Sequence, residues 1–487
     1  SNNTGVGKHA LGANTTGDRN VAVGANALDA NTTGVQNTAV GQGALGDSTT
    51  GDSNTAVGRL ALGSNTSASN NTAVGKEALL ANTTGTQNVA MGAFTLDNNT
   101  TGGQNTALGT QALGDNTTAS NNTAIGFDAL GANTTGTANA AMGAFALDAN
   151  TTANFNTASG YQSLTANTTG GNNTGIGANA LRDNTTASDN TAVGNQALLV
   201  NTTGTENVAV GSGALDANTT ADHNTAMGHG ALGVNTTGTA NTSIGRGSMG
   251  SNTTANNNTA VGKDSLAANT TGTENVAVGA FALDDNTTGD RNVALGFGAL
   301  GVNTTGEKNI SIGRGSMGSN TTASDNTAVG ENALHTNTTG VNNVAVGAIA
   351  LDANTTANNN TALGYGALTD NTTGGSNTGV GQGSGEQITT GSNNLCLGRN
   401  AGRAASPGGA ITTGSNRVVL GNDDTTDLFC ADTSISASDE RDKADITDFK
   451  IGLDWINALR PVTYVWDKRT WYGTDAESYA TPDGSKK

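Results

Sequence analysis

Large apolar and aromatic side chains are scarce in this sequence. Aromatic residues make up 3% of its 487 residues, hydrophobic residues of all kinds 34%, and proline occurs 3 times. Globular domains are nearer to half apolar, so the core of an ordinary enzyme is not expected. The 2 cysteines, Cys396 and Cys430, cannot form a disulfide framework, and no Cys/His cluster has the spacing of a zinc site. We therefore expect no metal and no cofactor.

Positive charge is scarce as well. The chain has 21 Lys and Arg residues against 39 Asp and Glu residues, a net charge of −18. Nucleic acid and an anionic membrane surface would both be repelled, so neither is an expected partner. The sequence has no run of 18 apolar residues, and it begins Ser-Asn-Asn without an initiator Met or a signal peptide. We interpret it as part of a longer soluble chain that does not insert into a membrane.

Glycine, by contrast, is abundant and strictly periodic. A Gly recurs at every seventeenth residue from Gly7 to Gly398, in 24 consecutive registers, and an Asn stands four residues before each. The consensus of one period is N-T-A-V-G-x-x-A-L-x-x-N-T-T-G/A-x-x, a regularity that excludes disorder. Early examples of the two periodic residues are Asn20, Asn37 and Asn54 with Gly24, Gly41 and Gly58.

The pattern within one period predicts short strands and tight turns. Each period contains Gly and Asn-Thr-Thr breakers, and its apolar spacing does not follow 3.6 residues, which excludes a helix. In N-T-A-V-G, alternation sends Thr and Val to one face and the small residue to the other, where only a methyl group fits. In a stacked β-coil, the Gly supplies a positive φ or room for a neighbouring backbone, and the Asn forms a ladder with its equivalents. The predicted fold class is all-β, a fibrous β-solenoid or β-roll.

A single 17-residue coil cannot be stable alone. It buries about four modest apolar side chains, which do not offset the ordering entropy of its own residues. Stacking, and several chains together, would supply the rest. At about 4.8 Å per coil, the 24 coils of residues 1–402 make a rod of about 115 Å. Such a rod is expected to act as a spacer or a fibre.

A longer repeat of 68 residues is superimposed on the 17-residue period. Asp148, Asp216, Asp284 and Asp352 recur every 68 residues, which is four coils. Strand stacking places them about 19 Å apart, too far for a shared calcium site. We interpret them as solvated carboxylates in a duplicated block of four coils.

The N-T-A-V-G and N-T-T-G repeats resemble the head repeats of trimeric autotransporter adhesins and the shafts of phage tail fibres. The resemblance covers residues 1–402. It implies a β-roll or β-solenoid in which three parallel chains pack side by side. This repeat is longer than the usual adhesin-head repeat, so its cross-section is expected to differ.

The period ends near residue 402. The next apolar-Gly pair, Leu420-Gly421, follows Gly398 by 23 residues, with residues 405–410 as a six-residue insertion. Residues 403–437 are predicted to be an irregular transition or a tip. All 3 tryptophans lie beyond it, in residues 438–487, where apolar spacing predicts a helix followed by a strand at 462–466. This C-terminal segment is expected to be a small α+β domain.

Residues 438–464 carry two distinctive strings, S-D-E-R-D-K-A-D-I and G-L-D-W-I-N-A-L-R-P-V-T-Y. They resemble the start of the endosialidase-type intramolecular chaperone domain, the self-cleaving C-terminal module of many phage tail fibres and tailspikes. The resemblance implies that Ser438 attacks the Ala437–Ser438 peptide bond, helped by Lys443, once three chains have folded together. A lysine serves as a base when burial lowers its pKa. About the first half of the family domain is present, which leaves open whether cleavage occurs in this chain.

Other candidate sites have simpler explanations. The 4 histidines, His9, His223, His229 and His335, fall at different positions of the period, so stacking gathers no ligand set. The Asn-Thr-Thr triplets also spell N-glycosylation sequons, but turn geometry explains their regularity. The glycines lack the strand-loop-helix context of a phosphate-binding loop.

The resemblances imply a homotrimeric phage tail-fibre shaft, extracellular and part of the virion. Its expected partners are two further copies of itself, a host-cell receptor that is a glycan or an outer-membrane component, and virion tail proteins bound through a region before Ser1. No enzymatic activity is expected apart from one autocleavage at Ala437–Ser438.

Three alternatives stay open. A bacterial cell-surface adhesin could carry the same modules. A flat face with Thr in every coil could bind ice, although adjacent Thr side chains point to opposite sides and leave half the array on each face. A polysaccharide-degrading tailspike has little support, because the rod offers no recurring pair of carboxylates and few aromatic platforms for sugar rings.

Overall fold

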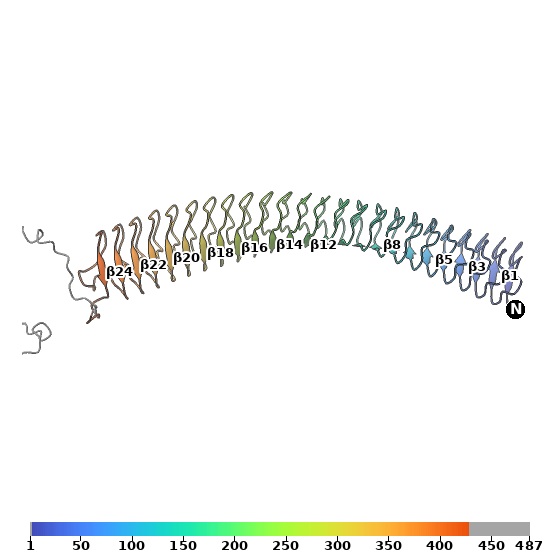
Figure 1. Ribbon diagram of the computed structural model, residues 1–487, viewed down its shortest axis with the longest axis horizontal. Helices are drawn as coiled ribbons and strands as arrows, with labels where there is room; N and C mark the ends of the chain where they lie inside the picture. The colour runs from blue at the N-terminus through green and yellow to red at the C-terminus, as the bar shows by residue number, and fades with distance from the viewer. Residues whose placement is uncertain (1, 428–487) are drawn as a thin grey trace, which may run out of the picture. The chain divides into compact units, whose positions relative to one another are not determined.

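The described part of the chain is a rod of stacked coils. A computed structural model describes residues 2–427. Residues up to Thr425 form one unit, a gently curved parallel β-solenoid (Figure 1). These residues contain strands and turns without a helix, so none of the described segments is a helix long and apolar enough to cross a membrane. The β-solenoid predicted from the 17-residue period is confirmed.

Each coil contributes one strand of three residues to a single 25-stranded sheet along one side of the rod. Successive strands pair in parallel, and from β1 to β24 the pairing is in phase with the period, so that Val23 lies beside Val40 and Val40 beside Val57. The strands are β1 (Thr4–Val6), β2 (Val21–Val23), β3 (Thr38–Val40), β4 (Thr55–Val57), β5 (Thr72–Val74), β6 (Val89–Met91), β7 (Thr106–Leu108), β8 (Thr123–Ile125), β9 (Ala140–Met142), β10 (Thr157–Ser159), β11 (Thr174–Ile176), β12 (Thr191–Val193), β13 (Val208–Val210), β14 (Thr225–Met227), β15 (Thr242–Ile244), β16 (Thr259–Val261), β17 (Val276–Val278), β18 (Val293–Leu295), β19 (Ile310–Ile312), β20 (Thr327–Val329), β21 (Val344–Val346), β22 (Thr361–Leu363), β23 (Thr378–Val380), β24 (Leu395–Leu397) and β25 (Val418–Leu420).

The strands alternate as the sequence predicted. In β3, Ala39 points inward and is fully buried, whereas Thr38 is half-buried and Val40 is exposed on the outer face. The inward residue is Ala, Gly, Ser or Cys in every strand from β1 to β24. A small side chain is needed there because the opposite wall of the coil is close: the inward Ser243 hydroxyl already reaches the Ser248 carbonyl at 2.8 Å.

The interior of one coil is narrow and partly polar. In the coil that begins with β2, the fully buried side chains include Ala22, Ala27, Leu28 and Asn31. Leu28 has a φ of 49°, in the left-handed region that L-residues avoid, and the Leu or Met at this position repeats the conformation from coil to coil. Its N–H donates to the Ala44 carbonyl of the next coil at 3.0 Å, and its side chain fills the centre of the coil. Burial and coil-to-coil hydrogen bonding thus hold a backbone that local preference opposes.

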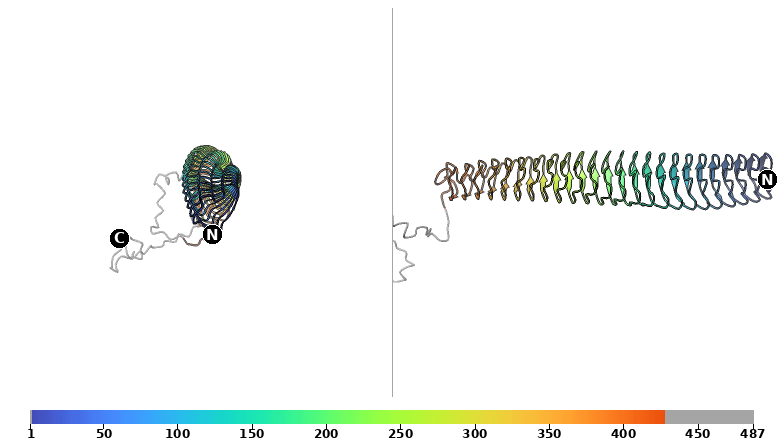
Figure 2. Two further views of the ribbon diagram at one scale, coloured as in Figure 1. Left: turned by 90° about the vertical axis from the view of Figure 1, so that its right-hand side faces the viewer. Right: turned by 90° about the horizontal axis from the view of Figure 1, so that it is seen from above.

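The solenoid continues through the predicted insertion. Successive coils rotate gradually about the rod axis (Figure 2), as expected for twisted strands. The insertion is closed at its base by the Ile411 N–H, which donates to the Gly402 carbonyl at 2.9 Å. β25 then pairs with β24 in the usual register, Leu395 beside Val418. One further coil therefore lies inside the range 403–437.

Candidate functional site

The periodic glycines are where neighbouring coils come closest. Gly24, Gly41 and Gly58 have φ values of 138° to 139°. A Cβ on any of them would collide with the carbonyl of the equivalent Gly in the next coil. The position therefore needs Gly both for its backbone conformation and for the close approach of the next coil.

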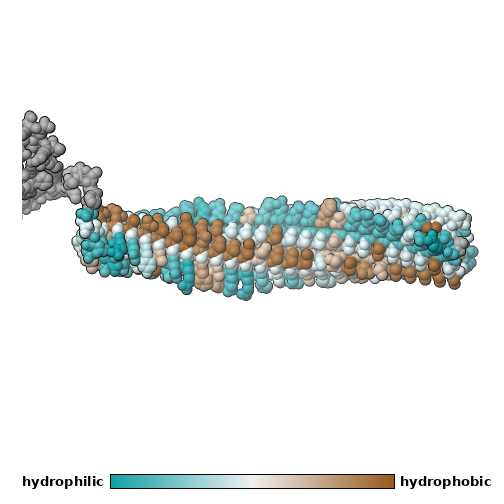
Figure 3. Space-filling model, turned by 90° about the horizontal axis from the view of Figure 1, so that it is seen from below, coloured by the Kyte–Doolittle hydropathy of each residue, from teal (hydrophilic) through white to brown (hydrophobic). Residues whose placement is uncertain are grey.

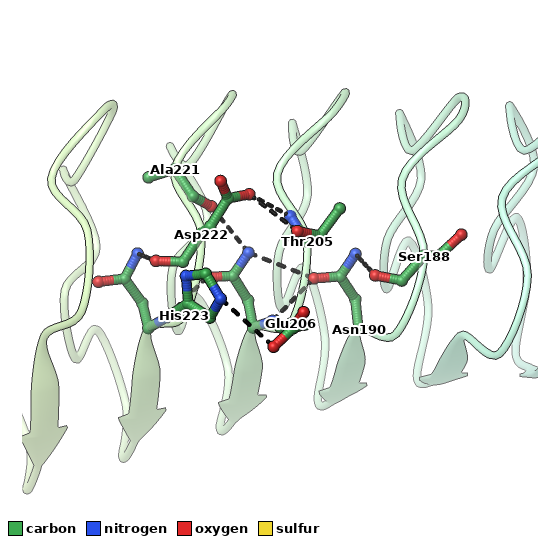
Figure 4. Close-up of polar contacts among 9 residues, drawn as sticks. Ser188, Asn190, Thr205, Glu206, Ala221, Asp222 and His223 are labelled. Atoms are coloured by element: carbon green, nitrogen blue, oxygen red, sulfur yellow. Dashed lines mark hydrogen bonds and ion pairs between the residues drawn. The ribbon is translucent and has the colours of Figure 1, made fainter.

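The periodic asparagines form a buried hydrogen-bonded ladder. The Asn37 N–H donates to Asn20 Oδ1 at 2.9 Å, and the Asn54 N–H donates to Asn37 Oδ1 at 2.9 Å. Asn37 Nδ2 also donates to the Gly51 carbonyl at 2.7 Å. Figure 4 shows the same arrangement around Asn190, and beside it the contact of 3.3 Å between His223 Nε2 and a Glu206 carboxylate oxygen. Buried polar groups arranged in this way fix the alignment of each coil on the next.

A second ladder runs through the Asn of each Asn-Thr-Thr triplet. Asn31 Nδ2 donates to Asn14 Oδ1 at 2.8 Å, and most of these side chains are fully buried. Ser48 interrupts the ladder, and Asn31 Oδ1 is left buried without a partner because the shorter Ser side chain does not reach it. The buried, hydrogen-bonded amides agree with the interpretation of the sequons as turn geometry.

The Thr residues of each triplet differ in their surroundings. The first Thr turns its hydroxyl toward the next coil, as Thr32 Oγ1 does in donating to the Thr49 carbonyl at 3.0 Å. The second, such as Thr33, is exposed. The rod therefore presents one exposed Thr column on this side.

The outer face of the sheet carries a continuous band of exposed apolar side chains, which we call the apolar stripe. It consists of the outward third residue of strands β1–β25, which is apolar in all but β10, together with the outward first residue beside it, which is Thr in most strands and apolar in the others. Within residues 2–427, 22 of the 29 exposed large apolar side chains lie there, and Val40 and Val57 are each 37% exposed. Figure 3 shows apolar side chains gathered in bands along the rod. Exposed apolar surface of this extent marks an interaction surface.

The turn that follows each periodic Gly has a different outer surface, which we call the turn edge. It consists of the first, second, fifth and sixth residues after the Gly. Aromatic side chains meet here across coils: Phe127 and Phe145 have ring centroids 5.3 Å apart, and Phe145 and Tyr161 6.2 Å, both edge to face. The 17-residue period did not predict these pairs. Rings at the first position of one coil and the second of another are 16 or 18 residues apart, and that spacing was the available signal.

The carboxylates of the 68-residue series lie at the fifth position of the turn edge and are half-buried, which corrects the prediction that they are solvated. Asp148, Asp216, Asp284 and Asp352 are all half-buried. Burial raises the pKa of Asp284 to about 6, with the nearby Asp285 charge adding to the effect. Burial also raises the pKa of Asp216 and of Asp352. At the fifth position, each carboxylate lies against the following coil, where water access is reduced.

A groove runs along the turn edge over four successive coils. Its volume is about 490 Å³, and four carboxylates line it. Burial, together with the charges of Asp148 and Asp115, raises the pKa of Asp128. Among the described residues, no group of three or more His, Cys, Asp or Glu side chains is placed to hold a metal ion. The carboxylates of this groove are therefore spread along it. Its lining includes Phe94, Asp97, Gln111, Asp115, Asp128 and Asp148.

The predicted cleavage site lies elsewhere in the chain. Ala437, Ser438 and Lys443 are outside the described residues, so their predicted roles stay predictions. Residues 438–481 match the family model described as chaperone of endosialidase. No curated protein sequence matches the chain. The chain thus combines a parallel β-solenoid with a C-terminal segment similar to the chaperone of endosialidase.

Proposed function

We propose that this chain forms the shaft of a homotrimeric phage tail fibre that attaches the virion to a host cell. Residues from 438 onward act as a self-cleaving chaperone for the shaft. The observation that carries the proposal is the apolar stripe, which runs from β1 to β25 on the outer face of the sheet.

The length and period of the stripe favour a second and third copy of this chain as its cover. Its third-position residues recur once per strand, about 4.8 Å apart, for the whole length of the rod. A globular partner would cover a few coils and leave the rest exposed. Parallel, in-register copies place each outward Val or Ile against its own equivalents, and three copies agree with the resemblance to trimeric shafts.

The assembly of such a rod requires that the register between chains be set correctly, and a chaperone can set it. Coils that are nearly identical can pair one step out of register and still bury the same apolar groups. A C-terminal domain that trimerises first would fix the starting register. Cleavage at Ala437–Ser438 by Ser438 and Lys443 would then release it and leave a fibre that cannot easily unfold. The family match over residues 438–481 supports this role.

The test is the native mass of the full-length gene product, as wild type and as Ser438→Ala. We expect wild type to be a trimer of chains that end at Ala437, and Ser438→Ala to be a trimer of uncut chains. A monomeric wild type would contradict the fibre. An uncut wild-type trimer would keep the fibre and contradict the proposed cleavage.

A further inference from the structure

The turn edge between the coils of Phe94 and Tyr161 exposes aromatic rings that neither the interior nor the apolar stripe explains. Phe127, Phe145 and Tyr161 form an aromatic ladder across three successive coils. Phe127 is 47% exposed and Tyr161 is 52% exposed. These rings are not part of the interior, which Ala, Leu and Asn already fill. They also lie off the apolar stripe, so the proposed trimer contact does not account for them.

The acidic groove adjoins this ladder. Phe94, Gln111 and Asp128 occupy the second position after the Gly in three successive coils, and Phe145 takes the next place in the same column. Asp148, from the same coil as Phe145, lines the C-terminal end of the groove. Aromatic rings, carboxylates and a side-chain amide thus follow one another along the turn edge, where Lys76 Nζ stands 4.6 Å from the centroid of the Phe94 ring.

We propose that this surface binds a chain of uncharged sugars laid along the rod. The apolar C–H face of a sugar ring stacks on an exposed aromatic ring, while its hydroxyls donate to acceptors beside the ring. The groove supplies such acceptors on Asp97, Asp115, Asp128 and Asp148. The inference rests on the proposed attachment function and names the class of receptor.

The charge of the groove determines which glycans it accepts. Four carboxylates stand within one groove, and their mutual repulsion contributes to the raised pKa of Asp128. A sugar acid would add like charge to this site and be repelled. Hydroxyl donors instead relieve the repulsion. The surface should therefore select uncharged sugar chains over anionic ones.

Part of this arrangement recurs along the rod, with Lys263 in the place of Phe127 and its Nζ 4.6 Å from the centroid of the Phe281 ring. Phe281, Phe297 and Asp284 stand 136 residues after Phe145, Tyr161 and Asp148, which is eight coils or about 38 Å. The Phe281 and Phe297 ring centroids are 5.8 Å apart, edge to face. A polymeric ligand can engage both places at once, which raises its avidity without any new kind of contact.

The experiment measures binding of the intact fibre to an array of immobilised oligosaccharides, half of them uncharged and half bearing uronic or sialic acids. We expect signal on uncharged members, weakened about tenfold by Tyr161→Ala. Phe155→Ala is the matched control, because Phe155 is 64% exposed but stands just before a periodic Asn, away from the groove. Asp128→Lys should shift binding toward the anionic members.

The outcomes separate this inference from the proposed function. No binding to any uncharged glycan, preference for anionic glycans, or an equal loss in Tyr161→Ala and Phe155→Ala would overturn it. Native mass of the same preparations reports assembly. A trimer without glycan binding contradicts only the glycan site, whereas a monomer contradicts the fibre itself.

Discussion

The apolar stripe and the turn edge are two outer surfaces of the same coil. The residue type is nearly uniform along the stripe but changes from coil to coil along the turn edge. The third strand residue stays apolar in all but one of the strands β1–β25, Ser159 in β10 being the exception. The turn edge changes from coil to coil, with Phe127, His229 or Arg246 at the first position after the Gly. A surface that repeats without change suits contact with another copy of the same repeat. A surface that varies locally suits recognition at particular points along the rod.

The largest expected effect is on trimer assembly, when charged residues are placed on the apolar stripe. Val40→Asp together with Val57→Asp would put two carboxylates per chain into the apolar stripe. In a trimer these charges would be gathered and desolvated, so we expect assembly to be lost. Native mass or light scattering measures it.

The control places the same two charges, again one coil apart, on the exposed Thr column, as Thr33→Asp with Thr50→Asp. That variant should remain trimeric. Loss of the trimer in both variants, or in neither, would break the distinction between the surfaces.

A second prediction compares two glycines of one coil. A Cβ on Gly228 would lie 2.6 Å from the Gly245 carbonyl oxygen of the next coil, at a φ of 138°. Gly230, on the turn edge, has a φ of 63° and nothing within 4 Å of an added Cβ. We expect Gly228→Ala to destabilise the local coils by about 3 kcal/mol or more, and Gly230→Ala by about 1 kcal/mol. Hydrogen exchange around β14 measures both, and equal losses of protection would contradict the close approach at Gly228.

The smallest expected effect concerns pH at the turn edge. The pKa of Asp284 is raised to about 6 from an ordinary 3.8, so its ionised form disfavours the folded coil. Stability should therefore increase as pH falls from about 6 to about 4, and the cost is fully present at pH 7. Asp284→Asn should remove this dependence and stabilise the coil at pH 7 by roughly 1 kcal/mol at most, after solvent screening.

Hydrogen exchange of the surrounding coils between pH 4 and pH 8 provides the measurement, corrected for intrinsic exchange rates. Asp423→Asn removes one exposed carboxylate near the end of the rod and is the control for net charge. A pH dependence that survives in Asp284→Asn would assign the effect to other groups.

Much of the solenoid follows from the sequence because its constraints repeat. The 17-residue interval between Gly24, Gly41 and Gly58 sets the length of a coil. Alternation in N-T-A-V-G correctly separates the buried Ala39 from the exposed Val40. Each of these signals recurs in many coils, so a single period predicts the whole rod.

Features that depend on the offset between coils could not be predicted in the same way. The left-handed backbone of Leu28 opposes its local preference and is held by contacts with the next coil. The contact between Phe145 and Tyr161 joins different positions of the period, so comparing equivalent positions misses it. The half-burial of Asp284 likewise depends on the coil that follows.

The central claim is that the apolar stripe is the contact between parallel, in-register copies of this chain. The most direct measurement is mild oxidation of Ile244→Cys, on the stripe, compared with Thr254→Cys on the Thr column of the same coil and with wild type. The account predicts that Ile244→Cys alone gives chains joined through the new cysteine at the same position of each. Equal joining in Thr254→Cys, or none in Ile244→Cys while the trimer persists, would contradict it.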